Sequence, residues 1–130
     1  RDSSTSRGLG DVYKRQPDVF VNHEIDLNSP ENISLSALGG NLIIENQGYN
    51  GLIIYRFSNY DYHAYDKSCT YEPLTACAEI DSISSSLAIC NCCNSVFLLD
   101  QDGSVANGPA ILSLKRYSTF LDGNMLFISN

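Results

Sequence analysis

All five cysteines of this chain fall within one quarter of its length, and this clustering limits what the chain can fold into. They are Cys69, Cys77, Cys90, Cys92 and Cys93. Thiols this close in sequence indicate one shared site, which is a metal ion, a metal cluster or a set of disulfides. If the protein is exported, the odd count leaves one thiol free or paired elsewhere.

Apolar residues around these cysteines come in short runs separated by turn signals, a pattern typical of all-β domains. Gly39-Gly40, Asp102-Gly103 and Asp122-Gly123-Asn124 are such turns. The strands that we expect are Val19–Val21, Ile33–Leu38, Leu42–Glu45, Leu52–Arg56, Tyr60–Tyr65, Ala78–Ile80, Leu87–Ile89, Val96–Leu99, Lys115–Phe120 and Met125–Ser129. This many short strands predict a small sandwich or partial barrel.

Residues 1–16 resemble translated sequencing-adapter DNA, and we set them aside. The run Asp11-Val12-Tyr13-Lys14-Arg15-Gln16 is what the transposase end of such an adapter encodes. We therefore expect a single domain over residues 17–130, in a gene that continues upstream. No apolar run approaches the roughly 20 residues that a membrane helix needs.

The chain is acidic, with a net charge of −7 at pH 7, and residues 17–130 are more acidic still. Such a surface repels phosphate backbones, so we do not expect a nucleic-acid partner.

Two cysteine loops carry the most specific pattern. The first is Cys69-Thr70-Tyr71-Glu72-Pro73, and the second is Cys90-Asn91-Cys92-Cys93-Asn94-Ser95-Val96-Phe97. Gly108-Pro109-Ala110 and Leu114-Lys115-Arg116-Tyr117 follow them. The arrangement resembles a Rieske domain, whose loops read C-x-H and C-x-x-H-(G/N)-x-x-F before a Gly-Pro loop. The Cys-Cys-x-Ser-x-Phe stretch is similar to that of a group of exported bacterial lipoproteins.

This resemblance implies an all-β, Rieske-like fold with a loop-rich subdomain at about residues 66–110. It also implies a [2Fe–2S] cluster covered by the Gly108-Pro109 loop, and an electron-transfer role rather than catalysis. A redox or surface protein would be the partner. The location implied is the cell envelope, with lipid anchoring.

The ligand positions carry over residue by residue. Cys69 and Cys90 stand at the two cysteine positions of the inner iron, where thiolates bind. Tyr71 and Cys93 stand where the family has the two histidines of the outer iron. Cys93 can bind as a thiolate, whereas a tyrosine binds only as phenolate, with a reference pKa near 10. Cys77 or Cys92 would be the substitute ligand if Tyr71 does not bind.

Three interpretations of the cysteines stay open. The first is an iron–sulfur cluster with altered ligands, and the second is a cluster-free surface domain stabilised by disulfides. The third is a zinc site made from four of the thiols. Some family members join these two loops by a disulfide, which implies a Cys77–Cys92 pair here, but sequence alone does not fix the connectivity. The two histidines, His23 and His63, are expected at the surface.

Overall fold

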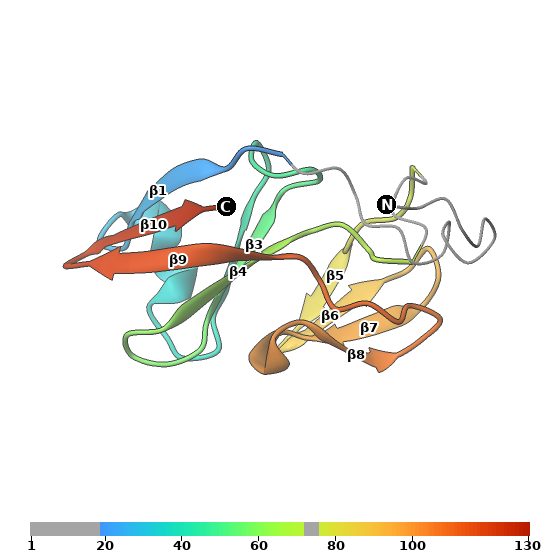
Figure 1. The fold of residues 1–130 in the computed structure, drawn as a ribbon. Helices are drawn as coiled ribbons and strands as arrows, with labels where there is room; N and C mark the ends of the chain where they lie inside the picture. Colours follow the sequence, from blue (N-terminus) through green and yellow to red (C-terminus); the bar gives the residue numbers. More distant parts are fainter. Residues whose placement is uncertain (1–18, 72–75) are drawn as a thin grey trace.

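The computed structural model describes residues 19–71 and 76–130, and the strands of this part form two antiparallel sheets (Figure 1). The larger sheet has six strands in the order β1-β10-β9-β4-β3-β2. Its strands are β1 (Asn22–Asp26), β2 (Asn41–Ile44), β3 (Leu52–Arg56), β4 (Tyr62–Asp66), β9 (Arg116–Asp122) and β10 (Met125–Ser129). The predicted all-β class is confirmed.

The smaller sheet has four strands in the order β5-β6-β7-β8 and lies beside the larger one (Figure 1). Its strands are β5 (Ser82–Ser84), β6 (Leu87–Cys90), β7 (Ser95–Leu98) and β8 (Ser104–Asn107). A short 3₁₀ helix, η2 (Leu99–Gln101), follows β7. All four strands fall between β4 and β9, which are neighbours in the larger sheet, so the smaller sheet is an insertion between two paired strands.

Strand β3 connects the two parts of the core, because side chains on its two faces alternate between them. Ile53 and Tyr55 belong to a buried cluster that includes the cysteine loops and the smaller sheet. Leu52 and Ile54 belong to a second buried cluster on the other side of the larger sheet. Both faces of β3 are therefore covered, which explains its nearly continuous apolar sequence.

The prediction of a strand at Ile33–Leu38 was wrong. Pro30–Leu35 forms a 3₁₀ helix, η1, with Pro30 in its first turn. Proline suits that position because its fixed φ is helical and its missing N–H has no partner there in any case. Leu35 is buried, while Ile33 is 70% exposed. Leu35 therefore attaches this segment to the core, and the segment does not bury alternate side chains as a strand would.

The Asp122-Gly123-Asn124 turn lies where the sequence placed it. β9 and β10 pair from Asp122 and Met125 onward, which leaves a two-residue loop. Gly123 has φ of 61°, a value that glycine adopts without steric cost and that hairpin loops of this length require. Within the described residues, no helix is long and apolar enough to cross a membrane.

Candidate metal centre

The first cysteine loop begins where β4 ends. Its two sides pair like a short hairpin, since Cys69 N–H donates to the Ala78 carbonyl at 3.0 Å and Ile80 N–H donates to the Lys67 carbonyl at 2.6 Å. Both Cys69 and Ala78 are buried in the core cluster. The backbone pairing therefore holds the Cys69 thiol inside the domain, between the two sheets.

The carboxylate of Asp66 fixes the base of this loop. Asp66 is fully buried and accepts five hydrogen bonds. The donors are the N–H groups of Tyr49 and Asn50, the N–H and hydroxyl of Ser68, and the phenol of Tyr117. A buried charge is stable only with such partners. Sequence analysis missed Asp66, because nothing local distinguishes it from a surface carboxylate.

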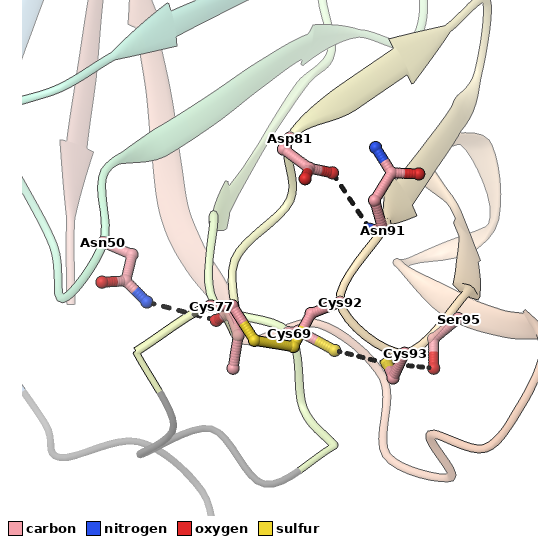
Figure 2. The surroundings of a disulfide bond; sticks show 9 residues. Asn50, Cys69, Cys77, Asp81, Asn91, Cys92, Cys93 and Ser95 are labelled. Carbon is pink, nitrogen blue, oxygen red and sulfur yellow. Dashed lines mark hydrogen bonds between the residues drawn. A yellow bond between two sulfur atoms is a disulfide. The ribbon is translucent and has the colours of Figure 1, made fainter.

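The second cysteine loop is the turn of the β6–β7 hairpin, which begins after Cys90 and ends before Ser95, its partner across the ladder. Asn94 adopts a left-handed φ of 65°, and its N–H donates to the Cys90 carbonyl at 2.7 Å. The N–H of Asn91 donates to the Asp81 carboxylate at 3.0 Å, which joins the turn to the start of β5 (Figure 2). The turn is thus closed on itself and fixed to the smaller sheet.

Three free thiols meet where the two loops approach each other, and Figure 2 shows two of them, Cys69 and Cys93. The Sγ atoms of Cys69, Cys90 and Cys93 all lie within 4.8 Å of one another, and those of Cys69 and Cys93 are 3.5 Å apart. Cys69 and Cys90 are fully buried, and Cys93 is partly exposed. This compact group of soft donors is suited to a thiophilic metal.

The three thiols differ in acidity. Burial raises the pKa of Cys69 and of Cys90 above the ordinary value. Burial also acts to raise the pKa of Cys93, but hydrogen bonds from the hydroxyl and N–H of Ser95 and from the other two thiols outweigh it, so that this pKa is lowered. Cys93 is therefore the thiol most ready to lose its proton.

The remaining two cysteines, Cys77 and Cys92, form a disulfide with their Cα atoms 5.7 Å apart. This bond joins the two cysteine loops, and Figure 2 shows it next to Cys69. Because Cys92 is taken up by the disulfide, its neighbour Cys93 is the residue of the pair whose sulfur lies among the free thiols.

Comparisons with known proteins bear on the fold. The chain superposes on a structure described as the complex of reduced oxygenase and oxidized ferredoxin in carbazole 1,9a-dioxygenase, with a TM-score of 0.51 and 16% identity over 71% of this chain and 82% of that one. It is 28% identical over 117 residues to the cytochrome bc1 complex Rieske iron-sulfur subunit of Corynebacterium efficiens. The fold is Rieske-like.

The match to the bc1 subunit covers 87% of this chain but only 27% of that protein. A further structural likeness is to the terminal oxygenase of carbazole 1,9a-dioxygenase from Novosphingobium sp. KA1, with a TM-score of 0.50, 16% identity, and coverage of 84% of this chain and 30% of that one. No family model matches the chain. At these identities the structural likenesses show the fold alone.

The other predicted site residues differ in their placement. Tyr71 is partly buried and packs against the core cluster that holds Cys69 and Cys90. Gly108 and Pro109 are exposed, while the next residue, Ala110, is buried in that cluster. Glu72 and Pro73 of the first loop lie outside the described residues.

Ser95 belongs to the site, although the sequence pattern gave it no role. It is fully buried, its hydroxyl lies 3.0 Å from the Cys93 sulfur, and it accepts a hydrogen bond from Ala110 N–H at 3.0 Å. Ser95 thereby connects the second cysteine loop to the segment after Gly108-Pro109. The Cys-Cys-x-Ser spacing was the signal for it.

The expectation that His63 lies at the surface was wrong. His63 is only 5% exposed, stacks on Phe57 with ring centroids 4.7 Å apart, and lies with Nδ1 3.0 Å from the Tyr65 hydroxyl. The Tyr65 hydroxyl donates its hydrogen to the Leu99 carbonyl at 2.7 Å. In the contact between His63 and Tyr65, the imidazole Nδ1–H is therefore the donor. The sequence of β4 is partly polar, which suggests that one face is exposed to solvent. In the structure both faces of β4 are covered, so His63 is buried.

The donor set does not fit a Rieske centre with two imidazole ligands. The chain has two histidines, and neither His23 nor His63 joins the thiol group. His63 lies on β4 within the network of Tyr65, and His23 lies on β1 at the edge of the larger sheet. Cysteine thiolates are themselves ligands of iron–sulfur centres, so the three thiols fit thiolate-bound iron instead.

Proposed function

We propose that this domain binds iron through Cys69, Cys90 and Cys93 and serves as an electron-transfer module, with Tyr71 as the fourth ligand. One observation carries the proposal: within a Rieske-type fold, the three free thiols of the two loops lie within 4.8 Å of one another. Thiolate ligands give an iron centre a more negative charge and a lower potential than imidazole ligands do.

The surroundings of the thiols support this role. The disulfide joins the loop that carries Cys69 to the loop that carries Cys93, so the ligands keep their relative positions. The Ser95 hydroxyl and N–H stabilise negative charge on the Cys93 sulfur. We further propose that the insertion at about residues 66–110 is the metal-carrying subdomain and that Gly108-Pro109 covers the centre.

We also propose a redox protein as the partner and an oxidising compartment, at the cell envelope, as the location. The Cys77–Cys92 disulfide supports the location, because such bonds persist where the surroundings are oxidising.

Anaerobic reconstitution with iron, with and without sulfide, tests the proposal. We expect a coloured protein that contains iron and gives a reversible redox response. Cys69→Ser, Cys90→Ser and Cys93→Ser should each lose most of the iron, and Tyr71→Phe should retain it less tightly. The matched control is Ser118→Ala, at an exposed serine of β9 outside the thiol group. A protein that stays colourless and free of iron would eliminate the electron-transfer role.

A second candidate function is a cluster-free surface domain with a binding or structural role. The Cys77–Cys92 disulfide favours it, since a disulfide between the loops stabilises them without any metal. It predicts that the purified domain contains no metal and that its unfolding midpoint does not respond to added iron or to a chelator.

A further inference from the structure

The Cys90-Asn91-Cys92-Cys93 turn has the Cys-x-x-Cys spacing of a metal-binding turn, which we call the knuckle, and the sulfurs at its two ends lie within 4.8 Å of each other. We propose that the two thiolates of this turn bind the same ion, so that the centre formed with Cys69 holds one metal ion rather than a two-iron cluster. The inference deepens the proposed function and rests on it, because it requires that the thiols form a metal centre.

Hydrogen bonds hold the turn closed. Asn94 is left-handed, with φ of 65°, and its N–H donates to the Cys90 carbonyl at 2.7 Å. The N–H of Asn91 donates to the Asp81 carboxylate at 3.0 Å, and the Ser95 hydroxyl lies 3.0 Å from the Cys93 sulfur. The two thiols at the ends of the turn are therefore held close together by the fold itself.

Cys69 completes this group from the other loop, with its sulfur 3.5 Å from that of Cys93. The N–H of Cys69 donates to the Ala78 carbonyl at 3.0 Å, which holds this residue in place from its own loop. The arrangement suits sulfurs that lose their protons together when a cation binds.

The distances between the sulfurs match ligands of one ion. Zinc–sulfur bonds of about 2.3 Å in a tetrahedral site place the sulfurs about 3.8 Å apart. The Cys69 and Cys93 sulfurs are 3.5 Å apart, and no pair among the three exceeds 4.8 Å. In a two-iron cluster, Cys93 would bind a different iron from Cys69 and Cys90, and sulfide ions would bridge the two irons. The Cys93 sulfur would then have to move away from the other two sulfurs.

The disulfide separates the remaining sulfurs from this site. Cys92 lies inside the knuckle sequence, yet its sulfur is bonded to Cys77, which leaves three thiols for the ion. Tyr71, the fourth ligand in the proposed function, packs against the core cluster that holds Cys69 and Cys90. Three thiolates and one further ligand suit a single thiophilic cation of the Zn²⁺ or Fe²⁺ class.

Metal titration of the metal-free chain, with its disulfide intact, tests the inference. We expect Zn²⁺ and Co²⁺ to bind at one ion per chain with release of protons, and Co²⁺ to show the absorption of a tetrahedral thiolate site. Cys90→Ser and Cys93→Ser should each weaken binding by more than about 10-fold, since even changes outside the ligand shell cost that much. The double variant Cys77→Ser/Cys92→Ser should keep one ion per chain.

Reconstitution of the wild-type chain with excess iron and sulfide tests the single-ion site separately from the proposed iron-binding function. One iron per chain without acid-labile sulfide supports the single-ion site. Two irons and two sulfides per chain would overturn it while leaving the iron-binding function in place. If the wild-type chain bound none of these metals, the single-ion site and the proposed function would both fail.

Discussion

The phenol of Tyr117 donates a hydrogen bond to the carboxylate of Asp66 at 2.7 Å, at the point where the chain leaves the larger sheet and returns to it. The backbone makes the same junction, because the N–H of Asp66 donates to the Lys115 carbonyl at 2.9 Å. The insertion that carries all five cysteines is therefore closed at its base by these two hydrogen bonds. Because Asp66 also accepts hydrogen bonds from Ser68, this junction positions the start of the first cysteine loop.

Removing the Tyr117 hydroxyl tests the importance of this junction. Tyr117→Phe should lower the free energy of unfolding by about 2 kcal/mol, as expected for a buried hydrogen bond to a charged group. Asp66→Ala should cost more, because it leaves the buried donors of Tyr49, Asn50 and Ser68 without their acceptor. Urea unfolding measures both values. Tyr60→Phe, at a residue that is 84% exposed, is the control and should change little.

The Cys77–Cys92 disulfide closes a loop with a sequence separation of 15 residues. Restricting the unfolded chain over such a loop stabilises the folded state by about 3 kcal/mol. Cys77→Ser and Cys92→Ser should each lower the unfolding free energy by about this amount, and reductant should destabilise the wild-type domain but neither variant. Alkylation followed by mass spectrometry should find three free thiols before reduction. An unchanged unfolding midpoint in Cys77→Ser would contradict the pairing.

The sequence predicted the central strands better than the edges. β3 and β10 lie where the sequence placed them, since their apolar runs are long and lie between two partner strands. β5 and β8 were missed, and β1 was placed too early in the chain. All three are edge strands, and edge strands are short and polar because only one side makes a ladder.

The candidate site was predictable in its residues but not in its arrangement. The resemblance to Rieske domains implied that the loops of Cys69, Cys90 and Cys93 meet and that Cys77 pairs with Cys92, whereas the sequence alone does not fix the choice of disulfide partner among five cysteines. The burial of Asp66 and His63 depends on strands and turns distant in the sequence. No local pattern contains that information.

Tyr65 makes the stability of the domain sensitive to alkaline pH. Burial raises the pKa of its phenol well above the ordinary 10.0, with Asp102 and Asp100 adding to the effect and Arg116 opposing it. Above about pH 10 the unfolded chain gives up this proton while the folded chain keeps it, so stability falls as pH rises.

The loss should approach about 1.4 kcal/mol per pH unit for this one group. Tyr65→Phe lacks the ionisable hydroxyl, so its urea-unfolding free energy should fall less between about pH 8 and about pH 11 than that of the wild type. The pKa of Tyr55 is also raised, chiefly by burial, and both proteins share that contribution. Parallel pH profiles for the two proteins would show that Tyr65 ionises equally in the folded and unfolded chains.

In the metal-free domain with its disulfide intact, Cys93 should react with iodoacetamide before Cys69 and Cys90. The thiolate is the nucleophile, and Cys93 combines a lowered pKa with partial exposure, whereas burial raises the pKa of the other two. Peptide mapping after brief alkylation near neutral pH identifies the labelled residue. Ser95→Ala should slow the labelling of Cys93, because it removes the hydroxyl 3.0 Å from that sulfur, and Ser118→Ala, at an exposed serine, should not. Preferential labelling of Cys69 would show that the Ser95 hydrogen bonds do not set the order of reactivity.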